Sequence, residues 1–449
     1  MEVGRFLQEF FLHLNDRKVR YCVLWGYEDL PNSPGNDVDL WVHPEDQPKF
    51  RETLLEIAQQ NSWSVLFPIV SARLVGQGEG KYYLIHRTPP YDIVHIDSWS
   101  ILYWKGIPYI EEMTKAFYMT PKGFNIPVPG VEAACLLLRS CLNGRELTDY
   151  HKQKIAEGLR KDSQRFFQIL SEALGDKPSS FVVRLVSKHE WDNIPSPWYF
   201  RKHLIIQSLR RKPFRQMRWW LTYLIQGVRI RLRGGYRLFV AFIGPDGSGK
   251  TTLAARLIQS KMVQKCFSSI WYFHTNFPCL PRLRRFVPKW WLRAPDGTAF
   301  SKTQVRDLRP LSFFRCLIYP LYYGLANFLA HFWLWTQKKK GTLIVLDRYY
   351  YEYWVQPVFA RCPAWLPKLI MRFIPQPDLV FYIKNSPQIL HNRKEELPLE
   401  EIERQCQVYE AIVKSLSSGH ILDGSLNILR LAQEIEAMVI RVLERRLSV

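Results

Sequence analysis

Residues 244–252 (GPDGSGKTT) place three glycines, a lysine and two threonines at the G-x-x-x-x-G-K-[ST] spacing of a phosphate-binding loop. The glycines let the backbone adopt conformations closed to other residues and approach a phosphate closely. Lys250 reaches the β- and γ-phosphates, and the hydroxyl of Thr251 can ligate Mg²⁺. The sequence therefore predicts binding of ATP with Mg²⁺. The predicted nucleotide-binding residues are Gly244, Asp246, Gly247, Ser248, Gly249, Lys250, Thr251 and Thr252.

The segments around this loop alternate between strand and helix patterns. An apolar run, 237–243, predicts a buried strand before the loop, and 250–264 predicts a helix after it. The N-terminus of this helix and the backbone amides of the loop together favour the binding of an anion. The alternation predicts a doubly wound parallel sheet, with ligands at the carboxyl ends of its strands. Further strands are predicted at 270–273, 342–347, 378–384 and 420–423, and helices at 307–340, 399–416 and 428–447.

The loop, the strand end Asp347-Arg348-Tyr349 and the later strand 377–383 resemble the thymidylate kinase family of P-loop nucleoside monophosphate kinases. Residues 392–409 resemble the lid of that family and its following helix. The resemblance covers 237–449 and implies phosphoryl transfer by positioning and charge neutralisation.

The same resemblance implies roles for individual residues. Asp347 would lie near the metal or the acceptor phosphate, and Arg348 would clamp that phosphate with two hydrogen bonds. Asp246 would contact the acceptor. The positive charge at the transferring group would come from Arg393, Lys394 and Arg404.

The acceptor side departs from the family. Thymidylate kinases follow Asp-Arg-Tyr with a Ser-containing segment that ends in Tyr-Gln and recognises thymine, whereas residues 350–356 are YYEYWVQ. A long segment, 282–315, carries seven arginines. These features favour an acceptor larger or more anionic than a deoxynucleotide, so the resemblance supports kinase chemistry better than it supports thymidylate as the substrate.

Three carboxylates form a second candidate site near the N-terminus. A predicted strand, 20–25, leads to Gly26 and then to Asp37 and Asp39, which alternation places on one strand face. Asp97 ends another predicted strand. Three such carboxylates can hold Mg²⁺ for phosphoryl or nucleotidyl transfer.

A glycine followed by D-x-D and a later strand aspartate resembles the polymerase-β-type nucleotidyltransferase superfamily. The helical stretch 131–174 fits the helical extension common there. Tyr27 stands where that superfamily usually has serine, so both an active module and a degenerate one that only binds the kinase half or a shared substrate stay open. The pairing of the two halves resembles two-domain proteins of bacterial surface-polysaccharide gene clusters.

About half of the net charge of +21 lies in one segment. No acidic residue occurs between Asp192 and Asp246, and 201–237 carries eleven Lys or Arg among tryptophans. The first interpretation of this segment is a solvated basic linker between the domains. Its charge and tryptophans also suit contact with an anionic membrane surface, and binding of a nucleic acid is the third alternative. An apolar run, 316–335, is as long as a membrane span, but its Pro, Asn and His and its position before a sheet strand favour a buried or interfacial helix.

Eight scattered cysteines without a C-x-x-C pair, and no visible signal segment, predict a cytoplasmic protein. Peripheral contact of 201–237 with an anionic membrane is an alternative that the charge of this segment leaves open. The predicted domains are a nucleotidyltransferase-like α+β domain (1–130), a helical extension (131–180), a basic linker (181–236) and an α/β P-loop kinase domain (237–449). The favoured function is phosphoryl transfer to a nucleoside monophosphate or another phosphorylated small molecule. The alternatives are a kinase acting on a surface-glycan or lipid-linked sugar intermediate, and a non-catalytic nucleotide-dependent protein that binds membrane or nucleic acid.

Overall fold

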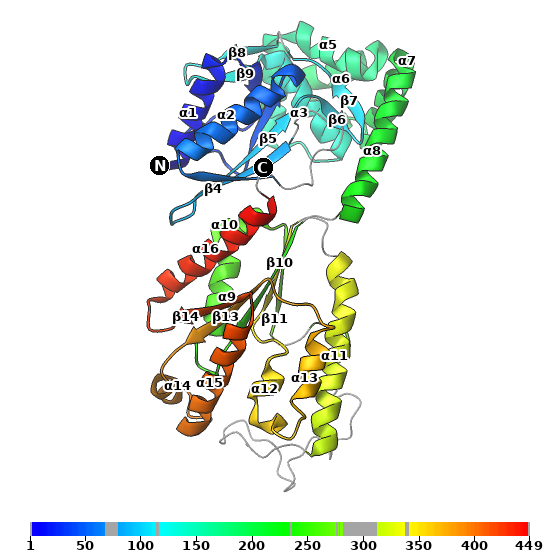
Figure 1. Cartoon of the computed structure of the whole chain (residues 1–449). Coiled ribbons are helices and arrows are strands. Elements are labelled where there is room, and N and C mark those ends of the chain that lie inside the picture. Colours follow the sequence, from blue (N-terminus) through cyan, green and yellow to red (C-terminus); the bar gives the residue numbers. More distant parts are fainter. Residues whose placement is uncertain are drawn as a thin grey trace. The chain divides into compact units, whose positions relative to one another are not determined.

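The computed structural model describes residues 2–67, 80–113, 116–233, 236–274, 277, 279–281, 312–336 and 341–447. The chain divides into two compact units, Met1–Gly234 with Leu447–Val449, and Gly235–Arg446 (Figure 1). We call them unit 1 and unit 2 and describe each by itself.

The N-terminal part of unit 1 contains a five-stranded sheet in the order β1-β2-β5-β4-β3. The parallel pair is β2 with β5, and the other neighbours are antiparallel. Both faces of β2 are buried, as its apolar sequence VDLWV requires. Two helices, α1 and α2, pack their aromatic residues on the sheet. The elements are α1 (Glu2–Asp16), β1 (Tyr21–Val23), β2 (Val38–Val42), α2 (Gln47–Gln60), β3 (Trp63–Leu66), β4 (Gly80–His86) and β5 (Ile93–Trp99).

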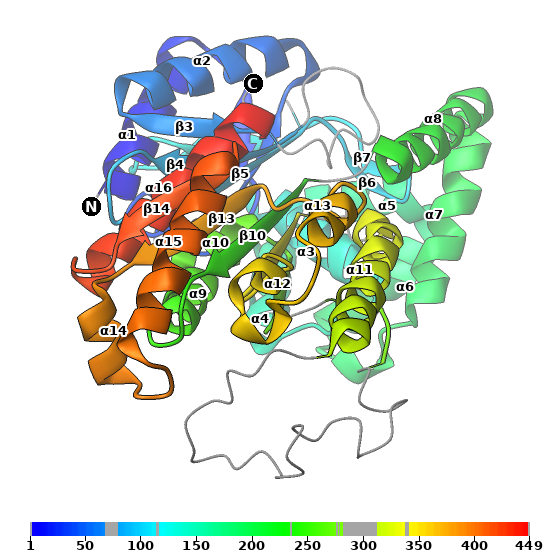
Figure 2. The ribbon, with the colours of Figure 1, turned by 60° about the horizontal axis from the view of Figure 1, so that its bottom comes forward.

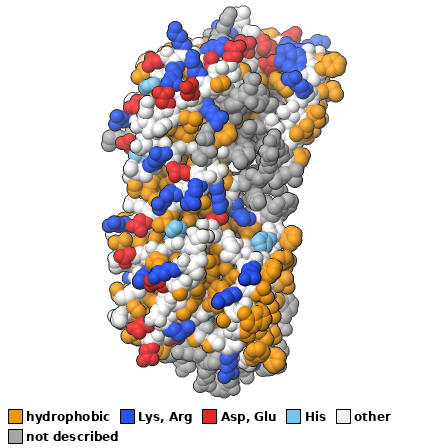
Figure 3. Space-filling model, viewed as in Figure 1, with side chains coloured by type: hydrophobic (Ala, Val, Ile, Leu, Met, Phe, Trp, Pro, Cys, Tyr) orange, Lys and Arg blue, Asp and Glu red, His pale blue; other side chains and the backbone are white. Residues whose placement is uncertain are grey.

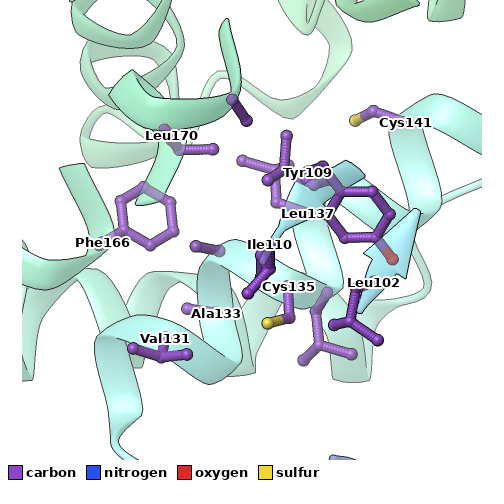
Figure 4. Packing of buried hydrophobic residues seen from close by; sticks show 14 of the residues in the cluster. Leu102, Tyr109, Ile110, Val131, Ala133, Cys135, Leu137, Cys141, Phe166 and Leu170 are labelled. Atoms are coloured by element: carbon purple, nitrogen blue, oxygen red, sulfur yellow. The ribbon is translucent and has the colours of Figure 1, made fainter. Parts of the chain in front are cut away.

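The rest of unit 1 is a helical layer around α3 (Pro129–Asn143). Nearly every α3 residue is buried, because its apolar side chains cover the whole helix circumference. Figure 4 shows Val131, Cys135 and Leu137 of α3 beside Phe166 and Leu170 of α5. The surrounding helices are α4 (Asp149–Lys161), α5 (Ser163–Leu174), α6 (Asp176–Ser187), α7 (Pro197–Arg211) and α8 (Pro213–Arg233). Two small hairpins pair β6 (Leu102–Trp104) with β7 (Ile107–Ile110) and β8 (Phe117–Met119) with β9 (Asn125–Pro127).

The basic segment 201–237 is helical over most of its length. Phe200 and Leu204 of α7 are buried in the helical core. In α8, the Gln216 side chain donates a hydrogen bond to the Gly106 carbonyl at 3.0 Å. A Cβ placed on Gly106 would lie 3.1 Å from the Cβ of Tyr223, so the turn between β6 and β7 fits closely against α8.

Unit 2 is built on a five-stranded sheet in the order β11-β12-β10-β13-β14, and every neighbouring pair is parallel. The predicted parallel α/β sheet is therefore confirmed. The central strands are apolar and buried except at the terminal residues Arg237 and Lys384, as strands covered on both faces must be. The strands are β10 (Arg237–Ile243), β11 (Ser269–Phe273), β12 (Thr342–Leu346), β13 (Leu379–Lys384) and β14 (Gly419–Asp423).

The strand order places a switch point beside β10. The chain first builds one side of the sheet with β11 and β12, and then crosses β10 to add β13 and β14. Ligands of open α/β sheets bind beyond the carboxyl ends of the strands at such a point. The phosphate-loop sequence begins there, directly after β10.

Helices lie on both faces of this sheet (Figure 2). They are α9 (Lys250–Gln259), α10 (Lys261–Cys266), α11 (Phe313–Thr336), α12 (Glu352–Val355), α13 (Trp365–Met371), α14 (Pro387–Arg393), α15 (Leu399–Ser415) and α16 (Ile428–Leu447). The single helix predicted at 250–264 is wrong, because Ser260 adopts an extended conformation and caps a new helix by accepting a hydrogen bond from Val263 N. The helix predicted at 307–340 is observed from Phe313, and residues 307–311 and 337–340 lie outside the described residues.

Within the described part of the chain, no helix combines the length and the apolar character that a membrane crossing requires. This agrees with the interpretation of 316–335 as a buried or interfacial helix. One face of α11 packs on the sheet through Ala330 and Leu334, while Phe314 and Phe332 are exposed.

Candidate functional site

The phosphate loop of unit 2 has the backbone that its glycines allow. Gly244, Gly247 and Gly249 all have positive φ, at 141°, 83° and 97°. A Cβ on Gly249 would meet no heavy atom within 4 Å, so there is room for a side chain at this position. Glycine is favoured there because the positive φ strains other residues. Gly249 is the N-cap of α9, and the first turn of that helix therefore faces the loop.

Lys250, the first residue of α9, is buried with 5% of its surface exposed. Its Nζ donates hydrogen bonds to the carbonyls of Gly244 and Pro245, each at 2.8 Å. The Asp246 carboxylate lies 3.9 Å away, beyond hydrogen-bond distance. Burial lowers the pKa of Lys250, because a desolvated ammonium prefers to lose its charge. An anion in the loop would offset this penalty.

Asp347 follows β12, the strand beside β10, so its carboxylate reaches the phosphate loop from the neighbouring strand end. Oδ2 accepts a hydrogen bond from the Thr251 hydroxyl at 2.6 Å. The same oxygen accepts from Tyr272 at 3.1 Å and lies 3.2 Å from His274 Nδ1. Oδ1 is buried and has no hydrogen-bond partner among the described residues. Tyr272 and His274 were missed from the sequence, although their place at the end of β11 was a usable signal.

Arg348, the next residue, is bonded to the loop. Its Nη2 donates to Asp246 Oδ1 at 2.5 Å, and its Nη1 lies 4.0 Å from Glu352. Burial lowers the pKa of Arg348, but Asp246 and Glu352 raise it more, so the net shift is upward. Glu352 also accepts a hydrogen bond from Tyr409 at 2.6 Å. The structure thus joins the two residues that the family resemblance assigns to the acceptor.

The three predicted lid cations have different surroundings. Arg393 Nη1 donates to the Gly247 carbonyl at 3.3 Å, so this guanidinium lies at the loop. A Cβ on Gly247 would lie 3.9 Å from the Cβ of Lys394, whose ammonium pairs with Glu396. Arg404 instead pairs with Glu401 on its own helix and donates to the Val355 carbonyl. Of the three, Arg393 is the one hydrogen-bonded to the loop.

Asn385 is a loop contact that the sequence analysis missed. It follows β13, and its Nδ2 donates to the Ser248 carbonyl at 3.3 Å. The Asn385 Oδ1 and the Ser248 Oγ are both buried without a partner among the described residues. Its position at the carboxyl end of a central strand is the signal that could have identified it.

Unit 1 brings Asp37, Asp39 and Asp97 together. Asp39 of β2 is in register with Asp97 of the adjacent parallel strand β5. Carboxylate oxygens from the three residues lie within 4.8 Å of one another. Asp37 precedes β2 and is exposed, whereas Asp39 and Asp97 are 4% and 3% exposed. The expected cluster is therefore present, with two buried members and one at its mouth.

The two buried carboxylates already have partners within unit 1. Asp39 accepts hydrogen bonds from the indoles of Trp25 and Trp99, the latter at 3.2 Å. Asp97 pairs with Lys81. Burial raises the pKa of Asp97 to about 6, although Lys81 opposes the shift. A metal ion would have to compete with these donors for carboxylate oxygens.

The turn at Gly26 leads into a second polar cluster. Gly26 has a φ of 66°, and the Tyr27 hydroxyl after it donates to Glu132 at 2.8 Å. Lys154 pairs with Glu28 at 3.0 Å and with Glu132 at 3.4 Å. Tyr27, which stands in place of the expected serine, is thus tied to the helical layer. Nothing in the local sequence pattern indicates this cluster.

A large cavity of unit 1 lies away from the three carboxylates. It measures about 720 Å³ and lies between β7, α5 and the junction of α7 with α8. Arg165, Arg211 and Lys212 line it, and Lys212 pairs with Glu111 at 3.1 Å. None of the predicted site residues belongs to its lining.

No protein-family model matches the sequence, and a search of curated proteins gave no significant match. The functional interpretation therefore depends on the geometry of these two sites.

Proposed function

We propose that unit 2 transfers a phosphoryl group from Mg-ATP to a phosphorylated small molecule. The observation that carries this proposal is the 2.6 Å hydrogen bond between the Thr251 hydroxyl and the Asp347 carboxylate. P-loop enzymes hold Mg²⁺ with the threonine or serine of the loop and an aspartate at the end of a neighbouring strand. An ordinary glycine-rich turn would not require the Thr251 hydroxyl and the Asp347 carboxylate to lie in contact.

The residues at this point fit a magnesium ion. The free oxygen of Asp347, Oδ1, is buried and lacks a partner among the described residues, and hard oxygen ligands are those that Mg²⁺ prefers. When bound, the metal neutralises charge on the phosphates. The hydroxyl of Thr251 and the carboxylate of Asp347 would hold it.

The remaining loop residues would bind the donor phosphates. Lys250 is a buried cation whose hydrogen bonds go to neutral carbonyls, so a phosphate oxygen would replace weak partners with a charged one. Arg393 lies against the Gly247 carbonyl and would add positive charge from the lid side. Both groups would stabilise charge on the transferred group.

Arg348 and Asp246 would form the acceptor end of the site. The guanidinium can grip an acceptor phosphate with two parallel hydrogen bonds, and Asp246 fixes its orientation. The segment after Arg348 packs into the unit 2 core, since Tyr349, Tyr350 and Tyr351 are buried. A nucleoside monophosphate is the first acceptor to test. A larger phosphorylated acceptor, such as a surface-glycan or lipid-linked sugar intermediate, is the alternative that the basic segment 282–315 favours.

The test is a screen of acceptors by ADP release with the full chain. Nucleoside monophosphates, sugar phosphates and lipid-linked phosphates are offered in turn with Mg-ATP, and Asp347→Asn protein is the control. Acceptor-dependent ADP release that the control lacks is expected. Slow ATP hydrolysis that is the same with every acceptor would identify a nucleotide-dependent switch and refute the kinase.

For unit 1 we propose a divalent-metal site at Asp37, Asp39 and Asp97, favoured by their mutual distances within 4.8 Å. Nucleotidyl transfer is the activity that such a site would serve. The bonds from Trp25 and Lys81 to the buried carboxylates favour the competing interpretation, a degenerate domain. Metal binding by this cluster separates the two interpretations.

A further inference from the structure

One surface of unit 2 is apolar, exposed and unrelated to the nucleotide loop. On α11 it comprises residues that lie within about 80° of the helix circumference at 3.6 residues per turn. Their exposed fractions range from 40% for Ile318 to 75% for Phe314. Exposed residues of α13 and its C-terminal end add to it. We call this the α11–α13 face; it consists of Phe314, Ile318, Leu321, Leu325, Phe328, Phe332, Trp365, Leu369 and Phe373.

Figure 3 shows hydrophobic side chains gathered over the α11 region of unit 2. Single exposed apolar residues are normal on a protein surface, but a contiguous patch of this kind marks an interaction site. The opposite side of α11 already packs on the sheet through Ala330 and Leu334. The exposed side is therefore a second apolar face, which the described residues of unit 2 leave uncovered.

Contacts connect α11 to α13 and to the segment after Arg348. His331 Nε2 lies 3.0 Å from the carbonyl of Phe373, which follows the end of α13. A Cβ on Gly324 would lie 2.6 Å from Ile370 Cγ2, so the helices approach as closely as glycine permits. The Tyr350 hydroxyl donates to the Pro320 carbonyl at 2.8 Å, which attaches α11 to the segment that follows Arg348.

The exposed charges on and beside α13, within residues 308–377, have one sign. Between residues 308 and 377 the sequence contains two acids, Asp347 and Glu352. Their side chains are 0% and 15% exposed, so both belong to the interior of the candidate site. The exposed charged residues on and beside α13 are cations: Arg361, Lys368 and Arg372.

We propose that the α11–α13 face docks on the surface of an anionic lipid bilayer. Phe, Leu and Trp side chains would enter the boundary between headgroups and acyl chains, while Lys368 and Arg372 would contact the anionic headgroups. A second copy of this chain is a poorer occupant. Pairing the face with itself would bring cations together without an exposed acid from the same segments to compensate.

The test is cosedimentation of the full chain with lipid vesicles. Vesicles of phosphatidylcholine are compared with vesicles in which a quarter of the lipid is phosphatidylglycerol. Leu321→Glu with Leu325→Glu should weaken partitioning at least about ten-fold, because two apolar side chains are lost from the interface and two negative charges are gained. The matched control is Ile389→Glu with Leu429→Glu, which adds the same charge at exposed sites on α14 and α16.

A second variant isolates the electrostatic part. Lys368→Gln with Arg372→Gln should reduce binding to the anionic vesicles roughly 10- to 30-fold at low salt, with little change on phosphatidylcholine alone. Circular dichroism and the melting temperature show whether each variant folds. Failure of the folded wild-type chain to bind anionic vesicles would overturn the proposal. Equal vesicle binding by wild type and by the Leu321→Glu, Leu325→Glu variant would also overturn it. A third contradicting result would be a wild-type dimer that binds no vesicles and that the same two substitutions convert to a monomer.

The proposal does not depend on phosphoryl transfer, and vesicle binding is measured without nucleotide. A chain that binds vesicles but phosphorylates no acceptor would leave this inference intact and refute the kinase. A chain that phosphorylates an acceptor but binds no vesicles would refute the membrane proposal and leave the kinase intact.

Discussion

Arg348 donates a hydrogen bond from Nη2 to Oδ1 of Asp246 at 2.5 Å, which connects the end of β12 to the phosphate loop. These residues are 102 positions apart, and the parallel pairing of β10 with β12 brings their segments together. The guanidinium thus has a fixed orientation before any ligand binds. In the proposed kinase, this orientation would help to position the acceptor phosphate without first ordering the Arg348 side chain.

The first prediction concerns this clamp. Arg348→Lys keeps the charge but loses the planar fork, so it should not be conservative. We expect kcat/KM for the acceptor to fall roughly 10- to 100-fold, since a charged hydrogen bond contributes about 1.5–3 kcal/mol. Nucleotide affinity should change little. Acceptor kinetics and ATP titration decide the matter: weaker ATP binding with unchanged acceptor kinetics would place Arg348 on the donor side.

Lys250→Ala should abolish phosphoryl transfer. The substitution removes the buried ammonium that would bind the donor phosphates, and no other lysine of the described residues donates to the loop carbonyls. The control is Lys414→Ala, because Lys414 is exposed and forms an ion pair with Glu410, away from the phosphate loop. Turnover is measured at saturating Mg-ATP, alongside circular dichroism. Wild-type turnover in a folded Lys250→Ala protein would contradict the kinase.

The metal-binding role of Thr251 can be tested with two conservative changes. Thr251→Val removes the hydroxyl and keeps the shape, whereas Thr251→Ser keeps the hydroxyl that bonds to Asp347. We expect the valine variant to need at least about ten-fold more Mg²⁺ for half-maximal ATP binding, and the serine variant to resemble wild type. Nucleotide titrations at several Mg²⁺ concentrations measure this. Equal magnesium dependence in the two variants would exclude the hydroxyl as a ligand.

A separate prediction concerns metal binding by the carboxylate cluster of unit 1. Asp37→Asn with Asp39→Asn should remove divalent-metal binding from unit 1, because two of the three clustered carboxylates lose their charge. Calorimetry with Mn²⁺ on the full chain without nucleotide measures it, with Asp149→Asn as a control at an exposed aspartate. Equal Mn²⁺ affinity in the double variant and in wild type would reduce unit 1 to a structural or substrate-binding domain.

Asp97 should make the stability of unit 1 depend on pH. Its pKa in the folded chain is about 6, against 3.8 for the free side chain, chiefly because of burial. Between these values the folded state holds a proton that the unfolded state has released, so the free energy of unfolding falls as the pH rises. The loss is up to about 3 kcal/mol across this window and is complete above pH of about 6.

Scanning calorimetry at pH 4 and pH 7 tests this linkage. Asp97→Asn cannot titrate, so its stability relative to wild type should improve from pH 4 to pH 7. The ion pair with Lys81 forms only when Asp97 is ionised, and its effect is already included in the pKa of about 6. A stability difference that is the same at both pH values would show that Asp97 titrates normally.

The sequence by itself determined the local features of both sites. The glycine spacing of 244–249 fixes a loop with positive φ, because only glycine adopts that backbone without strain. Apolar runs of strand length alternating with helical patterns determined the parallel sheet of unit 2, since such strands must be buried on both faces. The carboxyl-end rule for such sheets then placed Asp347 beside the loop.

Only the tertiary structure decided which side chains meet across the sheet. The pairing of Arg348 with Asp246, the contact of Asn385 with the loop and the separate bonding of Arg404 join residues that no local pattern relates. In unit 1, the spacing of the aspartates indicated a carboxylate cluster. The partners of its buried members, Trp25 for Asp39 and Lys81 for Asp97, come from other segments of the chain. Local sequence sets backbone conformation and residue type, whereas burial and bonding depend on contacts between distant segments that form only when the whole sheet and its helices pack.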